Sequence, residues 1–497
     1  MVRRPGVIRS RLLDRGRRVG GAGFTRPRRF ACSIVRRGEP DPQPVSKQPT
    51  HFLGTPVTAP GPLGPQMLRA FSTIRGNPLS FLDATWREFG DIAQFPVPRP
   101  PSYLVNSPDG VRHVLVDNAR GYGKSTIQYR ALSLVTGEGL LTSDGATWRG
   151  QRRILQPAFH HSALQDVGGH VAEATARVKR QWSALEPGTV VDADAFMMGA
   201  ALEIVAASLM GTDLTGRSSE IAEATLEALD VVVARARVPI TPPEWLPTPA
   251  NRVLRRSVAR LDEAVAEMVS ARRDDPGHDL LGLLLSVRDE DDRPLSVAQI
   301  RDQLVTFIVA GHETVASALG WAWGLLAQHP DIAERVAAEA DAVAGERPVD
   351  FDDYQRLPFT KAVVEETLRL YPPAWLITRQ SLEPDVIDGT AIPAGALIIM
   401  SPWLLHRHPE LWIDPDSFQP DRFVADTDIP RFAHIPFGAG PRLCIGRDFS
   451  YVESVMVIAE LARHFSVSFP PGGSLPVGEP LVTIRPRGGM PLMVQPR

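Results

Sequence analysis

The sequence predicts a mainly α-helical protein with a smaller β-rich part. Apolar residues at helical spacing dominate much of the chain, whereas strand-like runs cluster in the C-terminal half. One proline-free stretch near residue 300 is long enough for a single helix of about 48 Å. The composition, with 43% hydrophobic residues among 497, is that of an ordinary globular protein. Length alone would allow two or three domains, although single enzyme domains also reach this size.

The first 50 residues are predicted to be a basic, disordered N-terminal extension. Residues 1–37 contain twelve arginines and one acidic residue, Asp14, and they lack the apolar core of a secretory signal. A transit-peptide-like leader or a misplaced start codon are the alternatives. Ordered structure is expected to form one domain over residues 51–497. Its proline-rich start, Pro56–Pro65, is expected to be extended.

Several segments have the apolar spacing of helices or strands. The predicted helices are Leu79–Phe89, Asp192–Met210, Ser218–Ala236, Arg252–Arg273 and a segment from about Arg447 to Arg463. Residues 238–250 contain five prolines, which exclude a helix there. Strands are expected within residues 385–400 and 481–494.

The longest predicted helix begins after Ser296. Ser296 and Gln299 form a capping-box pattern, and the next proline is Pro330. The helix is apolar nearly all round, so we expect it to be buried in the middle of the molecule. Its centre nevertheless carries His312, Glu313 and Thr314, which need polar partners in such a place.

Charge and cysteine content exclude several classes of function. The net charge of −3 argues against nucleic acid as the main partner. The two cysteines, Cys32 and Cys444, exclude a disulfide framework and a cysteine-rich metal site. No segment has the roughly 18 to 20 uninterrupted apolar residues of a membrane span. A cytoplasmic location is therefore expected.

Cys444 follows a glycine-rich loop and precedes a predicted helix. Free N–H groups and the helix dipole at such a junction favour a thiolate over a thiol. A thiolate held in this way is suited to bind haem iron. The loop glycines would let a flat ring approach the backbone, and Arg442 could reach an anionic group on that ring. A buried structural cysteine is the alternative interpretation.

The spacing Phe437-x-x-Gly440-x-Arg442-x-Cys444-x-Gly446 resembles the haem-binding signature of cytochromes P-450. The resemblance extends from about residue 60 to the C-terminus. It implies the family's mostly helical fold with a smaller β-rich lobe, in which haem b lies between the long central helix and the cysteine loop. Cys444 would be the axial ligand of the iron. The other implied haem-binding residues are Trp148, Arg152, Ala310, Gly311, Arg379, Phe437, Gly438, Arg442 and Gly446.

The resemblance also assigns a structural triad. Glu366 and Arg369 lie three residues apart on a helix, so their side chains share one face. The family joins this pair to an arginine from a later segment, here Arg422. Asp421 stands where the family commonly has glutamate. The triad is expected to brace the proximal side of the haem.

The segment 310–314 matches the oxygen-activating motif of the family. Its first two residues are small and would leave room for dioxygen, while Thr314 would hydrogen-bond the bound oxygen or a water. Glu313 would relay protons as a general acid. The alternative for Thr314 is a hydrogen bond to the carbonyl four residues earlier. Val315 replaces a second threonine that is frequent in the family, and His312 is expected to pack rather than bind iron.

These features predict a haem-thiolate monooxygenase that hydroxylates or epoxidises an apolar substrate, for example a terpenoid or fatty acyl compound. Electrons would come from ferredoxin or flavodoxin with an NAD(P)H-dependent reductase, because no flavin or iron–sulfur domain is expected in the sequence. The sequence also shows no dinucleotide-binding glycine motif, so NAD(P)H should bind elsewhere. A peroxide-using or non-redox haem-thiolate enzyme and a non-catalytic haem sensor, ligand carrier or electron carrier are the alternatives. The expected substrate pocket is lined by Phe307, Ala374, Trp375, Leu376, Leu481 and Val482.

Overall fold

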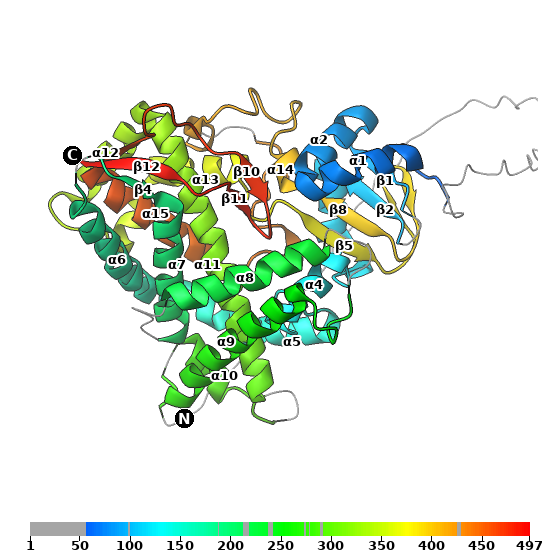
Figure 1. The fold of residues 1–497 in the computed structure, drawn as a ribbon, viewed down its shortest axis with the longest axis horizontal. Coiled ribbons are helices and arrows are strands. Elements are labelled where there is room, and N and C mark those ends of the chain that lie inside the picture. The colour runs from blue at the N-terminus through cyan, green and yellow to red at the C-terminus, as the bar shows by residue number, and fades with distance from the viewer. Residues whose placement is uncertain are drawn as a thin grey trace, which may run out of the picture. The chain divides into compact units, whose positions relative to one another are not determined.

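The computed structural model describes residues 56–497, except 98–99, 187, 212–217, 237–241, 273–274, 278, 289–291 and 425–428. The predictions made for residues 1–50 therefore lie outside the described residues. The described residues all belong to one compact unit (Figure 1).

Helices make up most of this unit. They are α1 Gly64–Gly76, α2 Pro78–Phe89, α3 Pro108–Arg112, α4 Ile127–Thr136, α5 Gly145–Leu155, α6 His161–Ser183, α7 Ala193–Met210, α8 Ser218–Ala236, α9 Pro249–Ala271, α10 Leu280–Ser286, α11 Val297–Gln328, α12 Pro330–Ala344, α13 Pro358–Leu370, α14 Pro402–Leu405 and α15 Arg447–His464. The strands are β1 Ile92–Phe95, β2 Ser102–Val105, β3 Tyr122–Gly123, β4 Val190–Asp192, β5 Ile377–Ser381, β6 Asp385–Ile387, β7 Thr390–Ile392, β8 Leu397–Met400, β9 Phe465–Ser468, β10 Gly478–Pro480, β11 Ile484–Pro486 and β12 Pro491–Pro496.

The long helices agree with the sequence prediction. Helices α2, α7, α8, α9, α11 and α15 lie where helical periodicity placed them, with ends displaced by at most three residues. Residues 385–400 and 481–494 contain strands as expected, although turns divide each run into shorter strands. The mainly α fold with a smaller β-rich part is thus confirmed.

Two predicted boundaries were wrong, both because of proline. Gly64 and Pro65 already belong to α1, and Pro249 begins α9. A proline in the first turn removes an N–H group that has no partner within the helix, and its fixed φ suits the helix start. The residues described between 242 and 248 are non-helical, whereas 238–241 lie outside the described residues.

The strands form separate sheets. A five-stranded sheet has the order β1-β2-β8-β5-β3, in which β2 and β8 are parallel and the other neighbours antiparallel. In Figure 1 its strands gather beside α1 and α2, away from α6, α7 and α15. A second sheet, β4-β12-β9, and the hairpin β10-β11 lie nearer the helices. Each part has its own apolar core, a small one in the five-stranded sheet and a large one among the helices.

Helix α11 is the central element of the helical part. The Ser296 hydroxyl accepts a hydrogen bond of 3.2 Å from the Gln299 N–H, and the Gln299 side chain accepts one of 2.9 Å from the Ser296 N–H, so the predicted capping box is confirmed. Helices α7 and α11 are long and apolar enough to span a membrane, but 67% and 83% of their most apolar windows are buried within the protein. Core helices of globular proteins share these properties.

Candidate functional site

Backbone hydrogen bonds and two left-handed glycines shape the cysteine loop. The Cys444 N–H donates to the Phe437 carbonyl over 3.0 Å, which closes the loop just before α15. Gly438 and Gly440 have φ angles of 72° and 69°, which side-chain-bearing residues rarely adopt. A Cβ on Gly440 would lie 1.9 Å from the Leu115 carbonyl oxygen, whereas one on Gly438 would meet only a side-chain carbon at 3.9 Å. The loop therefore packs tightly on one side and is open on the other.

The Cys444 thiol is exposed, yet protein surrounds it. Burial raises the pKa of the thiol, while the Gly446 N–H and the cations Arg152, Arg447 and Lys124 lower it. The expectation that the helix start alone favours the thiolate was incomplete, since burial opposes it. Direct coordination by a metal ion would replace the thiol proton.

Basic side chains gather near Cys444. Lys124 and Arg379 are buried, and Arg442 is mostly buried. Burial and the neighbouring Arg379 and Arg442 hold the pKa of Lys124 well below its usual value. Among the described residues, the one carboxylate that offsets these cations in their immediate surroundings is Asp144, which pairs with Arg442. Three basic side chains beside one acid suit a ligand with further carboxylates, which would favour the charged form of Lys124.

Lys124 was missed by the sequence interpretation. Its amino group donates to the Leu141 carbonyl over 2.7 Å and lies 4.4 Å from the Tyr129 ring centre. The sequence offered one signal, because lysine occurs at only four positions in this arginine-rich chain. Its position beside β5 depends on pairing between residues more than 250 positions apart, such as Tyr122 with Ser381.

Helix α5 holds the cysteine loop from one side. Arg152 donates a 3.0 Å hydrogen bond to the Leu443 carbonyl, next to the cysteine. The Arg442 guanidinium lies 4.2 Å from the centre of the Trp148 ring, a cation–π contact. The structure thus brings the predicted pair Trp148 and Arg152 to the loop. Contacts of either residue with a haem propionate stay a prediction.

The predicted triad is assembled in the core. Arg369 donates to both carboxylate oxygens of Glu366 over 2.6 and 2.8 Å, and Arg422 approaches Glu366 at 3.3 Å. The remaining N–H groups of Arg369 bind the carbonyls of His406, Pro415 and Ser417. All five guanidinium donors are therefore satisfied, as a buried arginine requires.

His406 connects the triad to the segment that leads into the cysteine loop. Its ring accepts a 2.9 Å hydrogen bond from the Ile435 N–H and lies 3.2 Å from the Arg369 carbonyl. Burial keeps the pKa of His406 well below its usual value, so the ring is neutral. Asp421, where the family commonly has glutamate, lies outside the triad and forms a bidentate pair with Arg335 at the surface.

In the middle of α11, one face of the helix is partly exposed. Between Gln303 and Ala327, every residue is buried except Ala310, Gly311 and Thr314. The structure therefore places three predicted residues on one partly exposed stripe of a buried helix. A Cβ on Gly311 would lie 2.5 Å from Val205 of α7, so this glycine is needed where the two helices approach closely. Its predicted role in leaving room for dioxygen remains untested by this contact.

Glu313 and Thr314 have different partners. The Thr314 hydroxyl donates a 2.6 Å hydrogen bond to the Ala310 carbonyl, which is the local bond considered as the alternative. Its oxygen can still accept a proton or a hydrogen bond from the open side. Glu313 is buried and accepts a 2.9 Å hydrogen bond from Thr483 in the turn between β10 and β11. Burial raises the pKa of Glu313, an effect that Arg485 and Thr483 oppose.

The residues expected to line the substrate pocket differ in burial. Phe307 is buried and its ring stacks on that of Phe159 at 5.4 Å, while Leu376 and Val482 are half-buried. Trp375 is buried and donates a 3.0 Å hydrogen bond to the Leu481 carbonyl, so it connects the segment between α13 and β5 to the β10–β11 turn. Ala374, which was also predicted to line the pocket, is exposed.

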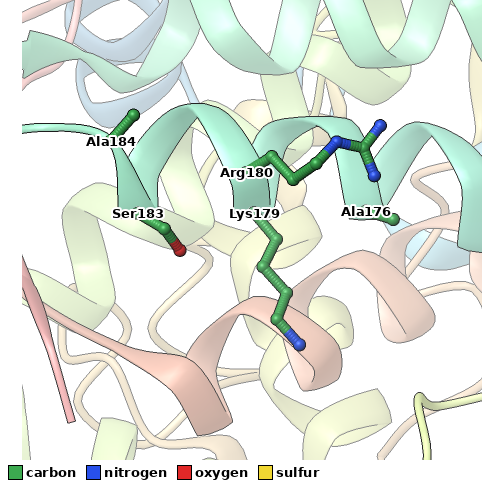
Figure 2. A pocket seen from close by; sticks show the side chains of 5 residues that line it. All are labelled: Ala176, Lys179, Arg180, Ser183 and Ala184. Atoms are coloured by element: carbon green, nitrogen blue, oxygen red, sulfur yellow. The ribbon is translucent and has the colours of Figure 1, made fainter.

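A separate hollow lies along α6 (Figure 2). It is lined by Ala176, Lys179, Arg180, Ser183 and Ala184, none of which was a predicted site residue. Lys179 points away from α6 and binds Glu460 of α15 over 3.1 Å. This hollow has no group in common with the cysteine loop.

The residues around Cys444 fit haem. The Cys444 thiol is exposed, and the neighbouring basic side chains Lys124, Arg379 and Arg442 are of the kind that binds carboxylates such as two propionates. In the part of the chain that the structure describes, no group of three or more His, Cys, Asp or Glu residues is arranged to hold a bare metal ion. A macrocycle that carries its own nitrogen ligands and needs one protein sulfur is consistent with both findings.

Comparisons with known proteins agree with this geometry. The family described as Cytochrome P450 matches residues 59–492. The chain is 34% identical to cyclooctat-9-en-7-ol 5-monooxygenase of Streptomyces melanosporofaciens, over 91% of this chain and 98% of that protein. It is 34% identical to pentalenene oxygenase of Streptomyces avermitilis, over 83% and 92% of the two chains. The crystal structure of CYP175A1 from Thermus thermophillus superposes with a TM-score of 0.70 at 31% identity, covering 87% of this chain and 97% of that one.

Proposed function

Because this chain belongs to the cytochrome P450 family, we propose that it inserts one atom of molecular oxygen into an apolar terpenoid. The chain is a monooxygenase that uses haem b, O2 and electrons from an external donor. The terpenoid substrate is supported by two relatives that bear the names of oxygenases of cyclooctat-9-en-7-ol and pentalenene. Phe307, Leu376 and Val482 provide apolar surface that fits such a molecule.

The cysteine loop and its neighbours would hold the haem, which when bound supplies the iron that binds and activates O2. We assign Cys444 as the iron ligand. Arg379, Arg442 and the additional Lys124 would bind the propionates, and Arg152 would fix the loop through the Leu443 carbonyl. The remaining haem-contacting residues in this assignment are Trp148, Ala310, Gly311, Phe437, Gly438 and Gly446.

Glu313 would donate protons at the site, and the Thr314 hydroxyl oxygen would accept a hydrogen bond there. The buried carboxyl of Glu313 is held by Thr483 and its raised pKa favours the protonated form, which suits a proton donor. The Thr314 hydroxyl proton is directed to the Ala310 carbonyl, so its oxygen can accept a hydrogen bond from the open side. The observation that supports the proposed reaction is the position of the two side chains. Thr314 is part of the partly exposed stripe of α11, and the buried acid Glu313 is its neighbour on the same helix.

The amount of product formed per NAD(P)H consumed tests these roles. Glu313→Gln and Thr314→Ala should lower the product formed per NAD(P)H consumed by tenfold or more, with the electrons lost as peroxide. Ser317→Ala is the matched control, because Ser317 is a buried hydroxyl on the same helix that instead binds the Ile484 carbonyl. Unchanged coupling in both site variants, or faster turnover with added peroxide than with a reductase, would refute an electron-driven monooxygenase.

The substrate class is tested separately by spectral titration. Terpenoid hydrocarbons and alcohols should shift the spin state of the ferric protein at lower concentration than fatty acids of equal carbon number. Tighter binding of the fatty acids would refute the terpenoid assignment and leave the monooxygenase reaction unaffected.

The electron donor is proposed to be a ferredoxin or flavodoxin reduced by an NAD(P)H-dependent reductase. Arg149 and Arg153 on α5 and Arg447 at the start of α15 are exposed on elements that flank Cys444. Positive charge at this place attracts an acidic protein and makes association dependent on ionic strength. Arg149→Glu should slow reduction severalfold at low salt, and an equal rate in both proteins would refute this docking surface.

We further assign residues 51–497 to one catalytic domain in the cytoplasm, with residues 1–50 as an extension that catalysis does not need. A chain that begins at residue 51 should retain haem and turnover. Loss of haem in the shortened chain would contradict this division.

A further inference from the structure

A cluster of charged side chains lies around the buried Glu313. Arg485 of β11 forms a close ion pair with Asp194 of α7, and both side chains are nearly inaccessible to solvent. Arg485 also donates to the Met198 sulfur over 2.9 Å. Its guanidinium and the Asp194 carboxyl act on Glu313 as well, with opposite effects on the acid.

Three polar atoms of this cluster have no hydrogen-bond partner among the described residues. They are Oε2 of Glu313, Oδ1 of Asp194 and Nε of Arg485. Each carboxyl thus has one satisfied and one unsatisfied oxygen, and the guanidinium has a spare donor. Unsatisfied buried groups are costly, so the arrangement calls for an explanation.

The charges do not balance if both acids are ionised. Arg485 is the cation that acts on both Asp194 and Glu313. His312, on the same turn of α11, is neutral because burial lowers its pKa to about 3. The other acid that faces Glu313 is Asp230 of α8, itself next to Glu479 of β10, and it disfavours a second negative charge. Burial and the sharing of one cation therefore favour a proton on one of the two carboxyls.

We propose that Arg485 is a positioning residue that selects which of these carboxyls is protonated. Paired with Asp194, it leaves the proton on Glu313, where it can be donated beside the open stripe of α11. If Arg485 pairs with Glu313 instead, the proton resides on Asp194 and the donor is lost. The inference deepens the proposed function, since it rests on Glu313 as proton donor.

Infrared titration of the haem-loaded full chain tests the proposal without turnover. The C=O band that disappears in Glu313→Gln identifies the protonated Glu313 carboxyl, and its pH midpoint is measured in each variant. Asp194→Asn releases Arg485 to Glu313, so the midpoint should fall by one pH unit or more, a tenfold change in the protonation equilibrium. Asp194→Asn/Arg485→Gln removes the cation too, and its midpoint should return to the parent value or rise above it.

Glu203→Gln is the control for the loss of a carboxylate from α7. Glu203 pairs with Arg177 over 2.8 Å and is not among the groups that act on Asp194 or Glu313, so its variant should leave the midpoint unchanged. A midpoint unaltered by Asp194→Asn, or lowered equally in the double variant, would overturn the proposal. If Asp194→Asn fails to fold, the double variant decides alone, because a midpoint below the parent value contradicts the role of Arg485.

Turnover separates this proposal from the proposed function. If Glu313→Gln leaves the product per NAD(P)H unchanged, Glu313 is not the proton donor, whatever the infrared midpoints show. If coupling depends on Glu313 but the midpoints do not respond to Asp194 and Arg485, the monooxygenase mechanism stands and the selecting role of Arg485 fails.

Discussion

Replacement of Arg369 by methionine should destabilise the protein far more than the same replacement of Arg335. Both arginines form bidentate pairs with a carboxylate, Arg369 with Glu366 and Arg335 with Asp421. The first pair is wholly inaccessible to solvent, whereas the side chains of the second are 49% and 64% exposed. Methionine keeps most of the aliphatic stem, so the two variants differ mainly in the charge and hydrogen bonds that each loses.

The expected magnitudes follow from burial. Removing one partner of a buried pair costs about 3–5 kcal/mol, because the other charge is left without compensation. The Arg422 side chain and the Gln419 N–H still bind Glu366, which favours the lower end, but three carbonyls also lose their donor. An exposed pair contributes about 0.2–1 kcal/mol. The contact of Arg335 with the Phe359 ring, at 3.8 Å, adds about 0.5–1 kcal/mol.

Urea unfolding of the haem-loaded proteins, followed by tryptophan fluorescence and by haem absorbance, measures the difference. Arg369→Met should unfold at clearly lower urea than Arg335→Met with a similar dependence on denaturant, and it should lose haem first. Equal midpoints for the two variants would refute the account of the triad as a buried brace.

Three further predictions concern acid stability, the cysteine loop and the cationic cluster. Burial lowers the pKa of His312 and His434 to about 3 and also lowers that of His406, so below pH 6.5 each should remove about 1.4 kcal/mol of unfolding free energy per pH unit. His434→Gln should therefore reduce this loss by about a third in urea unfolding at graded pH. Gly440→Ala should abolish haem retention because its Cβ would collide with the Leu115 carbonyl, whereas full haem content would contradict the loop geometry. Lys124→Met should weaken haem binding without destabilising the apoprotein, since the buried lysine repels Arg379 and Arg442; an unstable apoprotein with normal haem affinity would contradict this.

Much of the fold could be predicted because local pattern determines it. The periodicity of α8 and α11 and the box formed by Ser296 and Gln299 depend on neighbours within one or two turns. The cysteine loop could be predicted equally well, because its residues are contiguous in sequence and the positive φ angles at Gly438 and Gly440 favour glycine there. The triad needed the resemblance to supply Arg422, which lies 56 residues from Glu366.

The remaining site residues depend on contacts between distant segments. Thr483 reaches Glu313 across 170 residues, and Arg485 reaches Asp194 across 291. No periodicity or motif in either segment specifies these pairs, because they arise when the β10–β11 hairpin packs against α7 and α11. The packing of Gly311 against Val205 could not be predicted from the sequence for the same reason.

The absorption spectrum of the reduced protein under carbon monoxide, recorded for the parent chain and for two cysteine variants, tests the central claim most directly. The parent and Cys32→Ser should both show the long-wavelength band of iron bound by a thiolate, and Cys444→Ser should lose it. A parent chain that takes up no haem, or a Cys444→Ser protein with an unaltered band, would contradict the assignment of Cys444 as the iron ligand.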